Sequence, residues 1–229
     1  MKHNKFTVPA LLVLALTSIN AQANYDTVSL SGNLNTNLTT WTDGSAYSGL
    51  FSGTQTLGGI PFALSTDGNG NNAVYNPTSL TLSTNISDVT TVFTLINTAF
   101  GSYGSDVGSL TFHASNSDSF TVQLIEGVNV RDHFYGGFVN TLSDPTVTQA
   151  VFGVNSPGNA HLDMQTITLP VSFANETLTS VVFVSNQLGG SGQPFLAGLT
   201  LSAVPESEEW AMMLLGLPLI GWVARRKLA

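Results

Sequence analysis

The chain has 229 residues, of which only 9% are charged, and its formal net charge at pH 7 is −8. Residues 24–203 contain eleven Asp and Glu side chains but, histidines aside, a single basic side chain, that of Arg131. Such an acidic surface repels phosphate backbones, which argues against nucleic acid as a partner. Because cysteine is absent, an exported form would need a core that is stable without disulfides, and about 180 residues can supply one.

Residues 1–23 have the pattern of a secretory signal peptide. A short basic start leads into an apolar run over 8–16, and Ala21 and Ala23 place small residues at the two positions that signal peptidase requires. We therefore expect signal peptidase to cut after Ala23. A buried N-terminal helix is the alternative.

The central part of the chain is dominated by alternation of apolar and polar residues. Leu110, Phe112 and Ala114, for example, alternate with Thr111 and His113, which is typical of a half-buried strand. Strands are expected at residues 25–32, 47–52, 60–66, 79–86, 90–97, 109–115, 119–126, 165–174, 178–185 and 194–204. In the segment 165–174 the predicted apolar face consists of Ile167, Leu169, Val171 and Phe173. This pattern predicts an all-β domain over 24–203, an antiparallel β-sandwich or jelly roll.

One loop carries oxygen side chains at calcium-ligand spacing. Asp67, Asn69 and Asn71 occupy positions 1, 3 and 5 of a loop that begins at residue 67. The helix–loop–helix calcium site also needs Gly at position 6 and Glu at position 12, where this chain has Asn72 and Thr78. The loop is therefore either an irregular calcium site, the one cofactor that we consider possible, or a plain Gly/Asn turn.

Arg131 lies between the predicted strand 119–126 and Gly136-Gly137. We expect its guanidinium to be partly buried and to hold a carboxylate with both arms of its planar fork. The candidate carboxylates are those of Asp106, Asp144, Asp163 and Glu126. In the alternative hypothesis, a sugar-binding site is lined by Arg131, Asp132, His133 and Tyr135.

Aromatic residues in or near the predicted loops are typical of sugar-binding faces. They are Trp41, Tyr47, Phe51, Tyr75, Tyr103, Phe134 and Tyr135. Alternatively, these rings cap the core at the ends of strands. His161 and Asp163 are expected to share one strand face on the solvent side. The chain has no His-Glu-x-x-His and no Gly-x-Ser-x-Gly motif, and we assign no catalytic residue.

The C-terminal segment 204–229 has three parts. An acidic cluster is followed by the uncharged run 210–224 and then by Arg225, Arg226 and Lys227. Fifteen residues make a helix of about 22 Å, shorter than the roughly 30 Å core of a bilayer. We expect a single short transmembrane helix with its basic end in the cytoplasm, either a transient anchor or an ordinary C-terminal anchor.

This three-part layout resembles the PEP-CTERM sorting tail of Gram-negative bacteria. The family motif is Pro-Glu-Pro, and this chain has Pro205-Glu206-Ser207. The resemblance implies that the membrane protease exosortase cuts near Pro205 and Glu206. It further implies an inner-membrane-anchored precursor that is delivered to the cell surface or to extracellular polysaccharide.

Together these features predict an exported, non-enzymatic surface or biofilm-matrix protein that binds polysaccharide. Two alternatives remain: a secreted hydrolase acting on exopolysaccharide, and a purely structural coat protein. Paired carboxylates in one deep cleft would favour the hydrolase, whereas an aromatic platform would favour binding.

Overall fold

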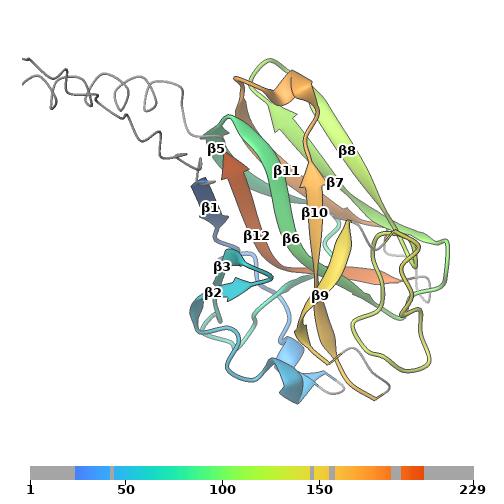
Figure 1. The fold of residues 1–229 in the computed structure, drawn as a ribbon. Helices are drawn as coiled ribbons and strands as arrows, with labels where there is room; N and C mark the ends of the chain where they lie inside the picture. Colours follow the sequence, from blue (N-terminus) through green and yellow to red (C-terminus); the bar gives the residue numbers. More distant parts are fainter. Residues whose placement is uncertain (1–23, 42–43, 145–146, 155–157, 187–191, 204–229) are drawn as a thin grey trace, which may run out of the picture.

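The computed structural model describes residues 24–41, 44–144, 147–154, 158–186 and 192–203 (Figure 1). The predicted signal peptide and the predicted transmembrane segment 210–224 lie outside these residues, as do Ala21, Ala23, Pro205 and Glu206. Within the described ranges, no helix is both long and apolar enough to cross a bilayer.

Antiparallel β-structure makes up most of the described chain, which confirms the all-β class. One sheet has six strands. Five of them run in the order β1 (Asn24–Val28), β12 (Gln193–Ala203), β6 (Val89–Ala99), β10 (His161–Thr168) and β9 (Thr148–Gly153), and β4 (Val74–Tyr75) pairs with β12. A four-stranded sheet has the order β5 (Leu80–Ser87), β11 (Thr177–Ser185), β7 (Asp106–Ala114) and β8 (Ser119–Ile125). A hairpin joins β2 (Gly53–Leu57) to β3 (Ile60–Leu64).

The larger core lies between the six-stranded and the four-stranded sheet. The predicted alternation holds in β7, where Leu110, Phe112 and Ala114 are buried and the residues between them are only partly so. Their partners across the core include Val92, Ile96, Leu199 and Leu201 of the six-stranded sheet. Burial of such side chains stabilises the fold by about 25 cal/mol per Å² of apolar surface.

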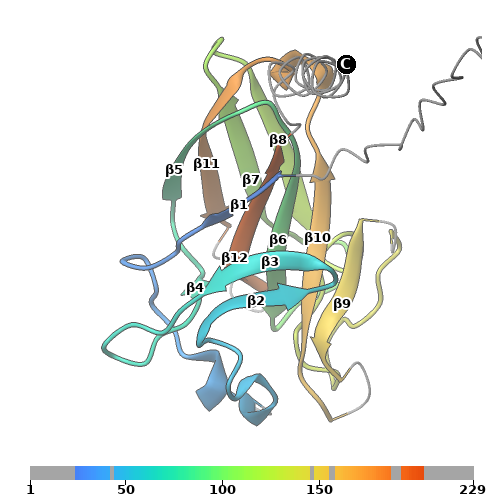
Figure 2. The same cartoon turned by 60° about the vertical axis from the view of Figure 1, so that its left-hand side comes forward.

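A second core covers the other face of the six-stranded sheet. Figure 2 shows the β2–β3 hairpin lying across β12 and β6. Because both faces are covered, β12 is buried along almost its whole length and does not alternate. At Gly198 a Cβ would lie only 3.0 Å from side-chain carbons of Leu95 and Phe62, so the hairpin packs here against a strand position without a side chain.

Two of the predicted strands are corrected by the structure. Residues 47–52 form no strand: the 3-10 helix η2 (Gly44–Tyr47) is followed by a turn. The strand predicted at 165–174 begins earlier, at His161, and ends at Thr168. Pro170, which has no N–H to donate to a ladder, precedes the 3-10 helix η3 (Val171–Phe173). Val171 is therefore 90% exposed instead of sharing an apolar face with Ile167 and Leu169.

The two ends of the described body meet. β1 and β12 are antiparallel neighbours, and Asn24 pairs with Ala203. Asn24 and Ala203 therefore lie side by side at one edge of the six-stranded sheet.

Candidate functional site

The site is built where β6 and β10 separate. These strands pair from Thr168↔Thr91 to Met164↔Leu95. Beyond the Met164↔Leu95 pair, residues 130–134 lie between the two strands. Thr98 N–H donates to the Arg131 carbonyl at 2.9 Å, and His133 N–H donates back to the Thr98 carbonyl at 2.9 Å. On the other side, His161 N–H donates to the His133 carbonyl, also at 2.9 Å. The inserted segment thus replaces a strand and keeps the backbone hydrogen-bonded.

Arg131 fixes this inserted segment. Its side chain is buried, and its Nε and Nη2 donate to Asp163 Oδ2 and Oδ1 at 2.7 and 2.9 Å. Nη1 donates to the Asn140 carbonyl at 2.8 Å, which ties down the far end of the loop. The structure confirms the predicted bidentate ion pair and identifies Asp163 as the partner.

The pair belongs to a buried polar cluster. Asn97 Nδ2 donates to Asp163 Oδ2, and Asp163 N–H donates to Asn97 Oδ1, both at 2.8 Å. His161 Nε2 lies 3.6 Å from Asp163 Oδ2. The expectation that His161 and Asp163 lie on the solvent side is wrong, because both are fully buried. Burial alone would raise the pKa of Asp163, but its contacts with Arg131 and His161 lower it.

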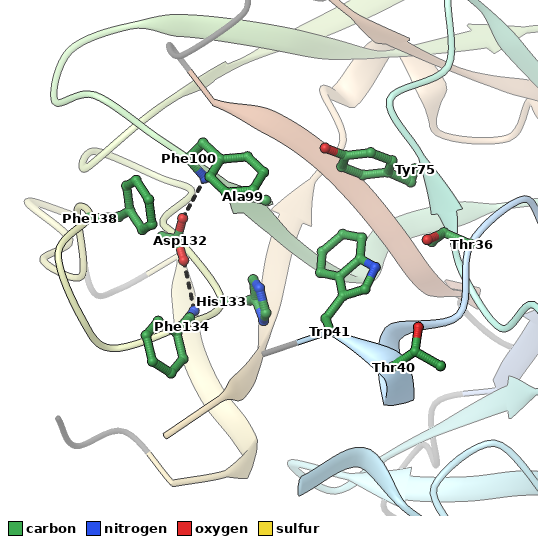
Figure 3. A pocket seen from close by; sticks show the side chains of 10 residues that line it. All are labelled: Thr36, Thr40, Trp41, Tyr75, Ala99, Phe100, Asp132, His133, Phe134 and Phe138. Carbon is green, nitrogen blue, oxygen red and sulfur yellow. Dashed lines mark hydrogen bonds between the residues drawn. The ribbon is translucent and has the colours of Figure 1, made fainter. Parts of the chain in front are cut away.

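A pocket of about 500 Å³ opens beside the inserted segment. We call it the aromatic pocket; its lining residues are Thr36, Thr40, Trp41, Tyr75, Ala99, Phe100, Asp132, His133, Phe134 and Phe138. Trp41 and Tyr75 lie on one side of it, the three phenylalanines on the other, and His133 between them (Figure 3). Phe100 and Phe138 are 51% and 42% exposed and meet edge to face at 5.4 Å.

Asp132 places a carboxylate in this aromatic surrounding. Its Oδ2 accepts the Phe100 N–H at 2.7 Å and its Oδ1 accepts the Phe134 N–H at 2.8 Å (Figure 3). Burial raises the pKa of Asp132 to about 6, although these backbone donors act in the opposite direction. The carboxylate is consequently ionised at pH 7.

His133 contributes a neutral ring to the same wall. Tyr47 Oη donates to the His161 carbonyl at 2.8 Å and lies 3.1 Å from His133 Nδ1. With its own proton used, Tyr47 Oη accepts from Nδ1–H, which leaves Nε2 as the acceptor nitrogen of His133. Burial lowers the pKa of His133 to about 4.

Glu126 does not line the pocket but is fully buried close to Asp132. Thr98 Oγ1 donates to its Oε2 at 2.7 Å, and its Oε1 has no hydrogen-bond partner among the described residues. Burial is the main reason why the pKa of Glu126 is raised to about 8, and the nearby Asp132 charge adds to it. A Cβ at Gly101 would overlap the Glu126 carboxyl group, so the glycine makes room for it.

The structure brings together some of the residues predicted for a sugar-binding site and some of the predicted loop aromatics. Asp132 and His133 line the aromatic pocket with the predicted Trp41, Tyr75 and Phe134, whereas Arg131 and Tyr135 do not. Of the other predicted aromatics, Tyr47 and Phe51 belong to the second core, and Tyr103 is 65% exposed. Phe100 and Phe138 were not predicted. Phe138 directly follows Gly136-Gly137 in the loop that carries Arg131. Its place in this loop is the sequence feature that could have identified it.

The predicted calcium ligands form a hydrogen-bonded turn. Asp67 Oδ1 accepts the N–H groups of Asn69 and Asn71, both at 2.8 Å, and Oδ2 accepts Asn71 Nδ2 at 3.0 Å. Although burial acts to raise it, these donors lower the pKa of Asp67. No group of three or more His, Cys, Asp or Glu side chains that could hold a metal ion occurs within the ranges that the structure describes. The geometry favours the turn interpretation of this loop.

For this turn we expect Asp67→Ala to lower the melting temperature by a few degrees, by the same amount with a chelator and with millimolar calcium. The reason is that the carboxylate holds backbone N–H groups of its own loop. Differential scanning fluorimetry measures the effect. A calcium-dependent rise in the wild type that Asp67→Ala abolishes would instead assign the loop to calcium by mass action.

No protein-family model matches the sequence, and none of the curated proteins matches it. The geometry of the aromatic pocket is therefore the observation that bears on function.

Proposed function

We propose that the protein is an exported, non-enzymatic polysaccharide-binding protein of the cell surface or extracellular matrix, with a body of the β-sandwich or jelly-roll kind. The aromatic pocket is the observation that carries this proposal. Five aromatic rings surround a space large enough for a sugar unit, and sugar rings stack their C–H faces on such side chains. Asp132 and His133 supply hydrogen-bond acceptors for hydroxyl groups.

The partial exposure of the Phe100 and Phe138 rings to solvent favours a polymeric ligand over a small enclosed one. These rings extend from the pocket to the surface. A chain can therefore continue past the sugar unit that the pocket holds. This arrangement is typical of binding surfaces that recognise one unit within or at the end of a polymer.

A secreted hydrolase remains the second candidate because two carboxyl groups with raised pKa values, Glu126 and Asp132, lie close together. Hydrolysis needs both to face one sugar unit. Of the described carboxylates, only Asp132 lines the pocket, while Glu126 is fully buried and does not line it. The geometry therefore supports binding better than cleavage. Incubating residues 24–203 with polysaccharides and assaying for reducing ends tests the alternative.

We expect the double substitution Phe100→Ala/Phe138→Ala to weaken polysaccharide binding about tenfold or more, since it removes two stacking surfaces of about 1 kcal/mol each. Both rings are substantially exposed, so the melting temperature should change little. A glycan array on residues 24–203 identifies the ligand, and titration calorimetry measures affinity. Val171→Ala, at an exposed apolar residue of η3, is the control. Unchanged affinity of the double variant would contradict the site.

The proposed export also makes a prediction. We expect a signal-peptidase cut after Ala23 and an exosortase cut near Pro205 and Glu206. Because Asn24 pairs with Ala203, both cuts would leave the edge pair β1–β12 intact. Intact mass spectrometry of the protein recovered outside Gram-negative cells measures the ends. A recovered chain that still carries residues 210–229 would rule out the sorting tail.

A further inference from the structure

The side chains around the aromatic pocket have a consistent electrostatic character. Its charged side chain is the carboxylate of Asp132, and the neutral His133 adds the acceptor Nε2. Among the described residues no lysine or arginine lines it. Arg131, the one arginine nearby in sequence, directs all three of its nitrogens to Asp163 and Asn140.

A ligand in this pocket therefore meets acceptors, a negative charge and the faces and edges of aromatic rings. A second carboxylate brought in by the ligand would have no cation to pair with and would face a body with eleven acidic residues. A protonated amine on the ligand would instead find a carboxylate to pair with. An ammonium group is attracted both to a buried carboxylate and to aromatic faces.

We propose that the aromatic pocket selects a sugar unit that carries a protonated amine, such as glucosamine in a deacetylated polysaccharide, over N-acetylated and uronic acid units. The inference rests on the proposed carbohydrate-binding function and specifies its substrate class. The ammonium group lies toward Asp132, and the sugar ring lies between Trp41 and the phenylalanine side of the pocket.

The acid nature of Asp132 supports a specific pH dependence. Its carboxylate protonates as the pH falls through about 6, while Glu126 stays protonated and His133 stays mostly neutral between pH 7 and pH 5. The affinity for tetramethylammonium, whose charge does not depend on pH, should consequently decrease from pH 7 to pH 5, and the affinity for an uncharged sugar should not.

The experiment titrates residues 24–203 with three tetrasaccharides: glucosamine, N-acetylglucosamine and galacturonic acid oligomers. We expect the glucosamine oligomer to bind at least about tenfold more tightly than the acetylated one, a difference typical of one charge-assisted contact. Tetramethylammonium chloride should displace it better than sodium chloride at equal concentration, because only the organic cation fits an aromatic surface.

Two matched variants separate pocket recognition from general attraction of a polycation. Asp132→Asn removes the pocket charge, and Asp118→Asn makes the same charge change at an exposed residue after β7. We expect only Asp132→Asn to reduce the preference for the amine. Since the amide introduced by Asp132→Asn would turn its N–H₂ group toward a backbone donor, the folding of this variant is checked first. If it fails to fold, the tetramethylammonium competition on the wild type takes its place.

The outcomes are distinguishable. Equal or tighter binding of the acetylated oligomer would overturn the amine selectivity and leave carbohydrate binding in place. Equal losses in Asp118→Asn and Asp132→Asn, or no advantage of tetramethylammonium over sodium, would also overturn it. Binding of no oligosaccharide at all would overturn the proposed function together with this inference.

Discussion

Arg131→Ala is expected to lower the free energy of unfolding by about 3–5 kcal/mol, because it strands the buried carboxylate of Asp163 without its bidentate partner. The same substitution frees the Asn140 carbonyl and loosens the segment that carries Asp132 and His133. Urea denaturation followed by circular dichroism measures the loss. Binding at the aromatic pocket should weaken in parallel.

Arg131→Lys should recover less than half of this loss. An ammonium group is a single point of donation and cannot reproduce a planar fork that reaches two oxygens of Asp163 and one carbonyl. The double variant Arg131→Ala/Asp163→Ala should cost less than the sum of its parts, since each single change leaves the other partner buried and unpaired. A variant Arg131→Ala that melts within a degree of the wild type would contradict this account.

The second large effect is expected to be stabilising. Glu126→Gln should raise the free energy of unfolding by about 5 kcal/mol at pH 9 and by less than about 1 kcal/mol at pH 5. Burial raises the folded-state pKa of Glu126 from 4.5 to about 8. The native state therefore binds this proton more tightly than the unfolded state does. The stabilisation that the bound proton contributes is complete below about pH 4.5 and is lost as the pH rises through 8. Glutamine stays neutral and keeps the acceptor for Thr98.

The window from pH 6.5 to 9 isolates this group. Asp132 has a pKa raised to about 6, so its contribution is already lost before the pH rises into this window. His133 has the opposite sign: its pKa is lowered to about 4, so its contribution is present above 6.5 and is lost on acidification. Chemical denaturation across the window should show a falling curve for the wild type and a flatter one for Glu126→Gln. Parallel pH curves for the wild type and Glu126→Gln would refute the interpretation of Glu126 as a buried acid. Asp118→Asn is the control for the change in net charge.

Local patterns in the sequence were enough for the fold class. In β7 and β8 every second residue is apolar because one face of each strand meets the core and the other meets solvent. The same reasoning missed β2, β4 and β9, which are short or polar and become strands by pairing with β3, β12 and β10. It also extended β10 past Pro170, where the missing N–H ends the ladder.

The sequence also predicted, from charge alone, that the single arginine of an acidic body would hold a carboxylate with both arms. Which carboxylate it holds depends on the separation of β6 from β10, which brings Asp163 of β10 to residues 130–134. Only some of the residues of the aromatic pocket were predictable, because the pocket also depends on contacts between distant segments. Trp41, Tyr75 and Phe100 come from segments far apart in the chain, and only the tertiary structure places them around Asp132. Local periodicity reports which face of a strand is buried, whereas a pocket depends on which strand ends meet, and that is decided by long-range pairing.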